Sequence, residues 1–448
     1  MKIKPTHIII LSFAGAIILG AVLLCQPFAA QNGNKISFID SLFTATSATC
    51  VTGLIVKDTA AFFSPLGKFI IIVLIQAGGL GIMTFSTFFA ILLGRKLTIK
   101  DSVIIQSAVT QYRIENLKSL IKYIIGFTLS LELFGAFLLF LRWLKMESWS
   151  LKDKIFHSLF HSVSAFCNAG FSTFSDNLCP FLKDPFVNLI IISLIVIGGL
   201  GFVTLIDLPK FFRRTKQFTK ISVQTKIVLT ATAALIISGT VFIFFMEKNN
   251  ALANLGFKDR VLASLFQSVT ARTAGFSTVD IGRLLHPTLF FIVFLMFIGA
   301  SPGSTGGGIK TCTFVILCAT FYAMLHNKER ASIFKTTIPK EVVRKAVVVF
   351  LLAIAWIFII TMILLITEES NLGNSNNYFI RILFEVVSAF ATVGLSANVT
   401  PYLSTLGKTL IIITMFAGRV GLLIIALSIA LQKEKTIYTY PEERIMVG

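Results

Sequence analysis

SLFTATSA at residues 41–48, followed by CVTGL at 50–54, decides the fold, because related segments recur three more times in this chain of 448 residues. The other copies are SLFHSVSA from Ser158, SLFQSVTA from Ser264 and ILFEVVSA from Ile382. Each copy leads into a glycine followed by Leu or Phe, and these glycines are Gly53, Gly170, Gly275 and Gly394. Such an internal period predicts a chain of four related units.

A long apolar run precedes each repeated segment and a second run follows it. The first runs cover 7–28, 119–144, 224–246 and 345–367, and the second runs cover 67–94, 185–208, 288–325 and 406–432. An apolar stretch of about 20 residues can cross the hydrocarbon core of a bilayer, whereas the repeated segments are too short and too polar to do so. We therefore predict an all-α polytopic membrane protein with eight transmembrane helices and four re-entrant pore helices.

The composition is typical of a membrane protein. The mean hydropathy is +0.85 and only 14% of the residues are charged, whereas charged residues make up about a quarter of a soluble domain. Lys and Arg number 40 against 21 Asp and Glu, but they lie in short loops between the apolar runs, which argues against nucleic acid as a partner. The loops on the side of both termini are the more basic ones, so we expect both termini to be cytoplasmic and the chain to lie in the cytoplasmic membrane.

The repeats divide the chain into four units and a tail. We place the units at 1–100, 101–216, 217–335 and 336–432, and a cytoplasmic tail at 433–448. Non-helical backbone at membrane depth survives only where it is buried in protein or lines a watery path. The four glycine segments are therefore expected to meet at one axis.

The segments that follow the four pore helices are candidate cation ligands. A helix that enters halfway from outside directs the negative end of its dipole toward the membrane centre, which favours a cation there. The backbone carbonyls that follow can replace the hydration shell of the ion, and glycine lets the backbones approach closely. The alternative is that these are ordinary helix-packing glycines. The candidate ion-binding residues are Val51, Thr52, Gly53, Asn168, Ala169, Gly170, Thr273, Ala274, Gly275, Thr392, Val393 and Gly394.

On the motifs CVTGL, CNAGF, RTAGF and ATVGL, the chain resembles the Trk/Ktr/HKT superfamily of potassium transporters over nearly its whole length, and most closely the pore subunit of the bacterial Ktr system. The resemblance implies a fourfold pseudosymmetric pore, one per subunit, that takes up K⁺. It also implies a homodimer of pore subunits, a separate cytoplasmic ring of regulatory nucleotide-binding subunits, and no cofactor in this chain. In this family a serine at the first filter glycine accompanies Na⁺ permeation, and all four residues are glycine here. Whether Na⁺ is a coupling or activating ion stays open.

A second glycine-rich stretch interrupts the third unit. Pro302 and several glycines break the apolar run of 288–325, so we expect an intramembrane loop at 299–308, just inside the filter. Arg419 stands where the first two units have Gly79 and Gly199, and an arginine at membrane depth should face the pore or pair with a partner. By resemblance, the loop and this arginine act as an intramembrane gate. The gate residues are then Gly303, Ser304, Thr305, Gly306, Gly307, Gly308, Lys310 and Arg419.

Three other features have competing interpretations. The stretch that ends at Lys310 resembles a phosphate-binding loop, but Ile309 replaces the glycine that such a loop needs. His157 and His161 lie one helical turn apart without a third metal ligand nearby, which favours polar packing over a metal site. Glu132 is either buried against a polar partner or a proton-coupling carboxylate.

Two further charges are expected to support the filter. Arg272 lies beside the third filter segment and Glu385 in the fourth pore helix, and we expect them to bond because unpaired charges near a dry filter are costly.

No catalytic constellation is apparent, so we expect the chain not to be an enzyme. A membrane-embedded enzyme is the rival class, and a Na⁺-selective or non-selective transporter of the same superfamily is the rival within transport. Residues 438–448 are a candidate contact surface for the regulatory subunits.

Overall fold

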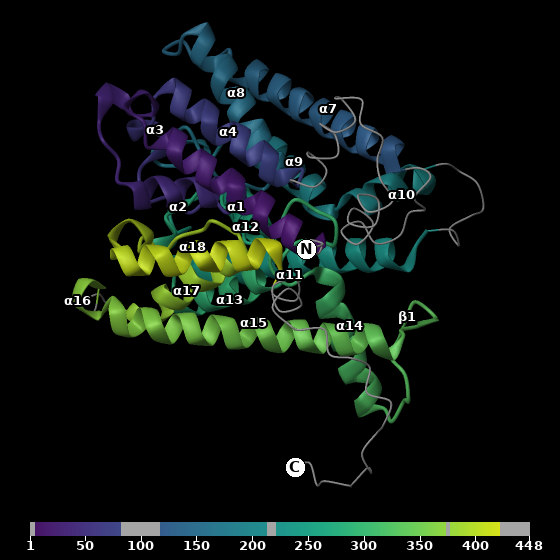
Figure 1. Ribbon diagram of the computed structural model, residues 1–448. Helices are drawn as coiled ribbons and strands as arrows, with labels where there is room; N and C mark the ends of the chain where they lie inside the picture. The colour runs from purple at the N-terminus through teal and green to yellow at the C-terminus, as the bar shows by residue number, and fades with distance from the viewer. Residues whose placement is uncertain (1–4, 82–116, 213–220, 373–376, 422–448) are drawn as a thin grey trace.

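The computed structural model describes residues 5–81, 117–212, 221–372 and 377–421 (Figure 1). The regular structure in these ranges is almost entirely helical, apart from a short antiparallel pairing of β1 (Ser332–Ile333) with β2 (Thr336–Thr337). The ends of the second apolar runs at 82–94 and 422–432, and the predicted tail at 433–448, lie outside the described residues. The predicted helical class is therefore confirmed for the described part of the chain.

Each unit has the same order of helices. The first helices are α1 (Pro5–Leu24), α7 (Leu117–Trp143), α11 (Val223–Met246) and α15 (Lys340–Thr367). The short helices that follow contain the repeated segments and are α2 (Phe38–Thr49), α8 (Leu151–Phe166), α12 (Phe257–Thr270) and α17 (Tyr378–Phe390). The third helices are α4 (Pro65–Gly79), α9 (Pro185–Leu200), α13 (His286–Phe297) and α18 (Thr405–Val420).

Polar caps mark the start of five of the eight short and third helices. Ser37 and Ser150 accept hydrogen bonds from the first-turn amides of α2 and α8, respectively. Ser64, Asp184 and Ser404 do the same for α4, α9 and α18. Each cap satisfies an amide that the helix itself leaves without a partner. The sequence therefore fixes the starts of these helices locally, before any contact between units is made.

The contacts between the helices close into a cycle. In every unit the short helix packs against the first helix, and the contacts between units are α4 with α8, α9 with α12, α13 with α17 and α18 with α2. The third helix of each unit thus contacts the short helix of the next unit, and the fourth unit returns to the first. α7 and α15 lie on opposite outer sides, with the short helices between them (Figure 1).

The apolar run at 185–208, predicted as one membrane span, is interrupted. α9 and α10 (Phe202–Phe212) meet at an angle of 104°. Gly201 has a φ of 84°, and a Cβ there would lie 2.5 Å from the carbonyl oxygen of Pro302. The amide of Phe202 donates to the carbonyl of Gly303 (3.1 Å) instead of continuing the helix. The loop of the third unit thus accepts the hydrogen bond of the Phe202 amide, and the chain bends between α9 and α10 at this point.

Helix length alone identifies fewer spans than the eight predicted. In the described ranges, three helices are long and apolar enough to cross a membrane, namely Lys122–Trp143, Val223–Asn249 and Lys340–Thr367, and the bent pair α9 and α10 would make a fourth. The other apolar helices are shorter, and they are Ile10–Leu24, Pro65–Gly79, His286–Phe297 and Thr311–Leu325.

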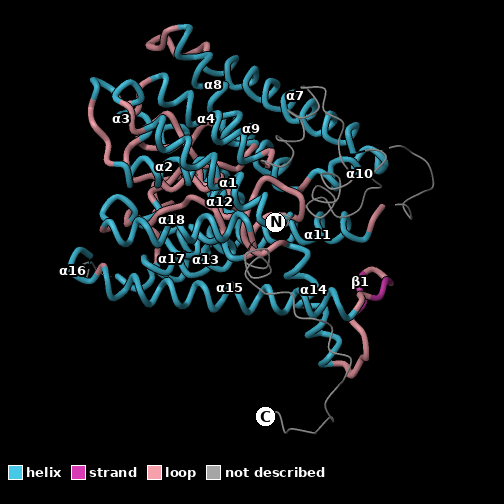
Figure 2. The backbone as a smooth tube through the Cα atoms, viewed as in Figure 1, coloured by secondary structure: helices cyan, strands magenta, loops and turns pink. Residues whose placement is uncertain are grey.

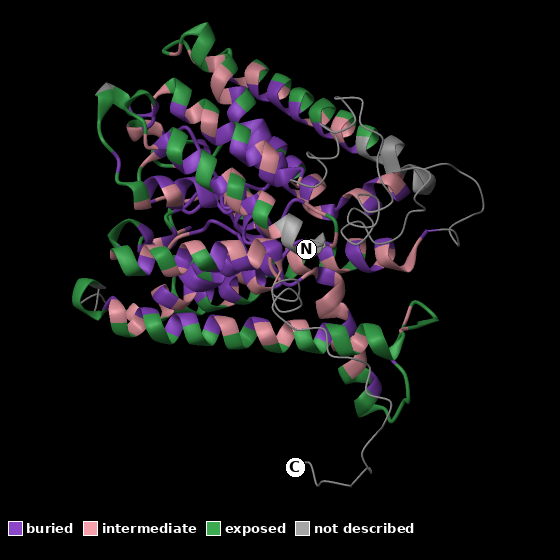
Figure 3. Ribbon diagram, in the orientation of Figure 1, coloured by how far each residue is buried: buried purple, intermediate pink, exposed green. Residues whose placement is uncertain are grey.

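The outer helices present apolar side chains to their surroundings. On α15, Leu351, Phe358 and Ile366 are 59%, 65% and 71% exposed, whereas the buried residues concentrate in the interior (Figure 3). Water disfavours so much exposed apolar surface, and lipid does not. These outward faces fit a helix bundle that lies in a bilayer.

A buried ion pair joins the first and fourth units. The Lys408 ammonium on α18 lies 2.7 Å from the Asp40 carboxylate on α2, and both side chains are largely shielded. Removing one partner from such a pair leaves an uncompensated charge in a poorly solvated place. This pair therefore fastens the point at which the cycle of units closes.

We expect Lys408→Met to lower the free energy of unfolding by about 3–5 kcal/mol, because Asp40 would stay buried without its partner. Arg283→Met is the matched control, because Arg283 forms an ion pair with Asp280 that is open to solvent, and the expected loss is below about 1 kcal/mol. Thermal unfolding of the two variants in the same detergent measures the difference. Equal losses would contradict a closing role for the buried pair.

Candidate functional site

Four loops of the same shape follow the short helices and meet in the interior (Figure 2). Each loop leaves its helix through a residue with positive φ and reaches its glycine two residues later, also with positive φ. The φ angles of the non-glycine residues are 56° at Val51, 59° at Asn168, 72° at Thr273 and 50° at Thr392. Backbone of this kind is costly for residues other than glycine and is retained where the surroundings hold it.

The four glycines form a closed ring of backbone contacts. A Cβ on Gly53 would lie 2.5 Å from the Ala169 carbonyl oxygen, and one on Gly170 would lie 2.8 Å from that of Ala274. The same distances are 2.5 Å from Gly275 to the Val393 carbonyl and 2.0 Å from Gly394 to that of Thr52. A Cβ at any of the four positions would displace a backbone oxygen of the next unit, so the ring in this form favours glycine. The structure thus brings all twelve candidate ion-binding residues together, and their role as ligands stays a prediction.

A row of hydroxyl side chains supports these loops, and the sequence analysis did not identify it. Ser47 donates to the Leu54 carbonyl (2.7 Å) and accepts from the Gly53 amide (3.1 Å). The equivalent hydroxyls are Ser164 with Phe171, Thr270 with Phe276 and Ser388 with Gly394. The signal was present in the sequence, because the seventh residue of every repeated segment is Ser or Thr.

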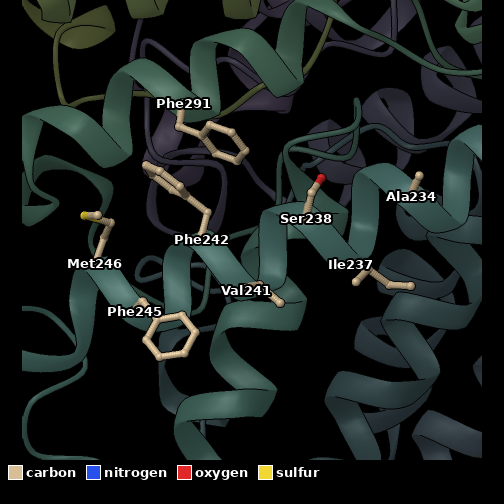
Figure 4. Close-up of a pocket in the computed structure, with 8 residues that line it drawn as sticks. All are labelled: Ala234, Ile237, Ser238, Val241, Phe242, Phe245, Met246 and Phe291. Carbon is tan, nitrogen blue, oxygen red and sulfur yellow. The ribbon is translucent and has the colours of Figure 1, made fainter.

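One end of the ring opens into a polar cavity. The cavity has a volume of about 1070 Å³ and is lined by the four glycines together with Asp58, Asp176 and Asp280. By contrast, a groove between α11 and α13 on the outside of the bundle is lined by apolar side chains apart from Ser238 (Figure 4). Of these two hollows, only the polar cavity reaches the four ring glycines.

The glycine-rich stretch of the third unit lies at the other end of the ring. It connects α13 to α14 (Thr311–Leu325), and a bridge between Ile298 and Ile309 closes its base. A Cβ on Gly306 would meet the Thr273 hydroxyl at 2.1 Å, and one on Gly307 would meet the Thr392 hydroxyl at 2.3 Å. These threonines begin two of the four loops, whereas the glycines at the end of the loops face the cavity. The stretch therefore packs against the end of the ring that faces away from the cavity.

Arg419 and Lys310 bond to this stretch. The Arg419 guanidinium donates to the carbonyl of Thr305 and also to the carbonyl of Gly78 in the first unit. The Lys310 ammonium donates to the Gly306 carbonyl at 2.6 Å. Arg419 thus joins three units at one point, and the contact with Gly78 was not foreseen. Guanidinium and ammonium groups suit this place because they donate several bonds to exposed carbonyls.

The expected bond between Arg272 and Glu385 is not formed, and this prediction was wrong. The Glu385 carboxylate accepts bonds from its own unit, including the Ala397 amide (3.0 Å) and the Thr400 hydroxyl (2.8 Å). Arg272 instead borders a small space beside Gly199 of the second unit. Glu385 finds enough donors in the loop after its own glycine, so it needs no cation.

The remaining candidate residues have polar partners. His161 contacts the Ser172 hydroxyl at 3.0 Å, and among the described residues no group of three metal-binding side chains occurs. Glu132 accepts a bond from the Gln76 amide at 3.0 Å and lies 3.6 Å from the Cys167 sulfur. Both findings fit the interpretation as buried polar packing.

The sequence and the fold of this chain are similar to those of known proteins. Residues 18–438 match the family described as TrkH, cation transport protein. The chain is 39% identical to Ktr system potassium uptake protein B of Bacillus subtilis, over 100% of this chain and 98% of that protein. It is 35% identical to potassium/sodium uptake protein NtpJ of Enterococcus hirae, over 100% and 98% of the two chains. The solved potassium transporter TrkH of Vibrio parahaemolyticus shares the fold, with a TM-score of 0.73 at 19% identity over 96% of this chain and 86% of that one.

The hydroxyl row yields a stability prediction. We expect Ser164→Ala to lower the free energy of unfolding by about 1–3 kcal/mol, because the buried Phe171 carbonyl would lose its donor. Ser193→Ala is the control, because the exposed Ser193 hydroxyl bonds only to Leu189 of its own helix, and a change within about 0.5 kcal/mol is expected there. Parallel thermal melts test this. A Ser164→Ala variant as stable as Ser193→Ala would show that the row does not hold the loops.

Proposed function

Because the chain belongs to the TrkH family of cation transport proteins, we propose that it takes up K⁺ across the cytoplasmic membrane as the pore subunit of a Ktr-type system. The observation that carries this proposal is the closed ring of Gly53, Gly170, Gly275 and Gly394, which opens into a polar cavity. Relatives named for potassium uptake match the chain over its whole length, which supports the same conclusion. The chain would act as a transporter, and no enzyme activity is proposed.

The proposed architecture is four units around one pore, each with two membrane-crossing segments and a re-entrant pore helix. Two of the second segments, α9 with α10 and α13 with α14, are broken helices, which a membrane protein tolerates where neighbouring protein satisfies the freed backbone. The units would follow the boundaries 1–100, 101–216, 217–335 and 336–432, with both termini and the tail at 433–448 in the cytoplasm. The excess of Lys and Arg on that side supports this orientation.

Selectivity would arise from the four loops. Their carbonyl oxygens replace the hydration shell of K⁺, and the C-terminal ends of α2, α8, α12 and α17 add the negative ends of four helix dipoles. The twelve loop residues named above are the proposed ligand set. Glycine at all four ring positions favours K⁺ over Na⁺. One relative is named as a potassium/sodium uptake protein, so Na⁺ conduction is the alternative function.

Gating would come from the stretch 303–308 with Lys310 and Arg419. The stretch lies against the first residues of two filter loops, and a plug at that place blocks ions that have passed the filter. The bonds of Arg419 to Thr305 and Gly78 hold the plug in place. A gate of this kind needs two arrangements of similar free energy.

The partners proposed are a second copy of the chain and a cytoplasmic regulatory ring, which the name of the Ktr system supports.

The filter proposal is tested at Gly53. We expect Gly53→Ser to lower the ratio of K⁺ to Na⁺ permeability about tenfold or more, because the new side chain would displace the Ala169 carbonyl oxygen and cost about 1.4 kcal/mol of differential binding. Gly33→Ser is the control, because Gly33 also has a positive φ (67°) but has no atom within 4 Å of its Cβ position. Fluxes of ⁸⁶Rb⁺ and ²²Na⁺ into proteoliposomes give the ratio. An unchanged ratio in a folded Gly53→Ser protein would refute the filter assignment.

The gate proposal is tested at Arg419. We expect Arg419→Ala to raise K⁺ flux through the pore subunit alone about 5- to 150-fold without changing selectivity, because the bonds that hold the plug are lost. Deletion of residues 304–307 should have the same effect. Arg330→Ala, at an exposed position, is the control and should leave the flux unchanged. If both gate variants fold and carry no more K⁺ than the wild type, the stretch is not the gate.

A further inference from the structure

The fourth residue of the repeated segments differs in every unit but is always polar and buried. These residues are Thr44, His161, Gln267 and Glu385, and each is at most 2% exposed. The residue two positions after the ring glycine is Ser172, Ser277 and Ser396 in the last three units, whereas the first unit has Ile55. In those three units the buried side chain bonds to the serine. The resulting pairs are His161 with Ser172, Gln267 with Ser277, and Glu385 with Ser396.

In the second unit, both ring nitrogens of His161 and the hydroxyl of Ser172 have hydrogen-bond partners. The Nδ1 atom of His161 lies 2.9 Å from the His157 carbonyl, which can only accept, so Nδ1 carries the proton. In the neutral ring Nε2 then accepts from the Ser172 hydroxyl at 3.0 Å. The Ser172 oxygen in turn accepts from the Phe174 amide at 3.0 Å. His161 thus fixes the backbone of the segment after Gly170.

The fourth unit reaches the same result with a carboxylate. Glu385 accepts from the Ser396 hydroxyl, the Ala397 amide (3.0 Å) and the Val399 amide (3.3 Å). The Ser396 oxygen accepts from the Asn398 amide at 3.1 Å, as Ser172 does from its own second neighbour. Acceptors as different as imidazole and carboxylate therefore hold the same serine in the same turn.

The third unit reverses the direction of the bond. The Gln267 amide donates to the Ser277 oxygen at 3.2 Å, and the Ser277 hydroxyl then donates to the Val279 carbonyl. The first unit lacks the pair, because Thr44 donates to the Asp40 carbonyl of its own helix (2.9 Å) and isoleucine stands in the place of serine. Ile55 and the three serines nevertheless all line the cavity that the four glycines line.

We propose that the three pairs are positioning elements that fix the cavity end of the filter, and that Ser172, Ser277 and Ser396 determine K⁺ selectivity through them. The inference rests on the proposed function of the ring. A smaller ion binds well only if the carbonyls move inward, and a segment tied to a buried pore-helix side chain resists that movement. The first unit has no tie, so three of the four loops carry the constraint.

Three kinds of variant test the proposal in proteoliposomes with ⁸⁶Rb⁺ and ²²Na⁺. We expect Ser396→Ala and His161→Leu to lower the ratio of K⁺ to Na⁺ permeability about 2- to 10-fold, as the loss of one hydrogen bond would. We expect Ser396→Thr, which keeps the hydroxyl, and His161→Gln, which copies the pair of the third unit, to restore the ratio. Thr44→Ala alters the same helix position in the unit without a pair and should leave the ratio unchanged.

The outcomes separate this inference from the proposed function. If Gly53→Ser changes the ratio and the pair variants do not, the pairs have no part in selectivity although the filter stands. If neither set changes the ratio, the filter assignment itself fails. An equal loss of K⁺ and Na⁺ flux in Ser396→Ala would show a merely structural role and would overturn the proposal. Ser396 is half-buried at the cavity, so Ser396→Ala still tests the proposal if His161→Leu does not fold.

Discussion

The close approach of four backbones at Gly53, Gly170, Gly275 and Gly394 is the constraint on which the rest of the structure depends. At each position a Cβ would lie within 2.8 Å of a carbonyl oxygen of the neighbouring unit. A ring this tight leaves little room for side chains on the glycines. The groups that support it therefore lie on the short helices around the loops. The helices, caps and hydroxyls around it can be understood as the means of holding four non-helical segments together in a medium that offers no water to unsatisfied backbone.

That support is built in two layers. The row Ser47, Ser164, Thr270 and Ser388 bonds to the loops directly, and the third helix of each unit packs against the short helix of the next. Hydroxyls are suited to the inner layer because one small group can both donate to a carbonyl and accept from an amide. The outer layer closes through the ion pair of Asp40 with Lys408, where the last unit meets the first.

The units share one plan but differ in detail, and two of the differences lie in the third and fourth units, beside the ring. In the third unit, the stretch from Ile298 to Lys310 interrupts the last apolar run and packs against one end of the ring. The fourth unit alone has Arg419, whose guanidinium bonds to that stretch and to the first unit. In the proposed function the symmetric ring would select the ion, and the asymmetric stretch, attached by a few bonds, would be the part that moves.

The sequence by itself predicted four units and determined the short helices, the glycines that follow them and the break at 299–308, because each follows from local composition and from a repeat visible in one dimension. It also indicated that Arg419 would face the pore or pair with a partner. Tertiary structure alone decided the bend at Gly201, the second acceptor of Arg419, and the partner of Glu385, for which the expected Arg272 was wrong. These depend on which unit lies beside which and at what distance, and a carboxylate takes the donors that packing brings within about 3 Å, whatever the charges elsewhere in the chain suggest.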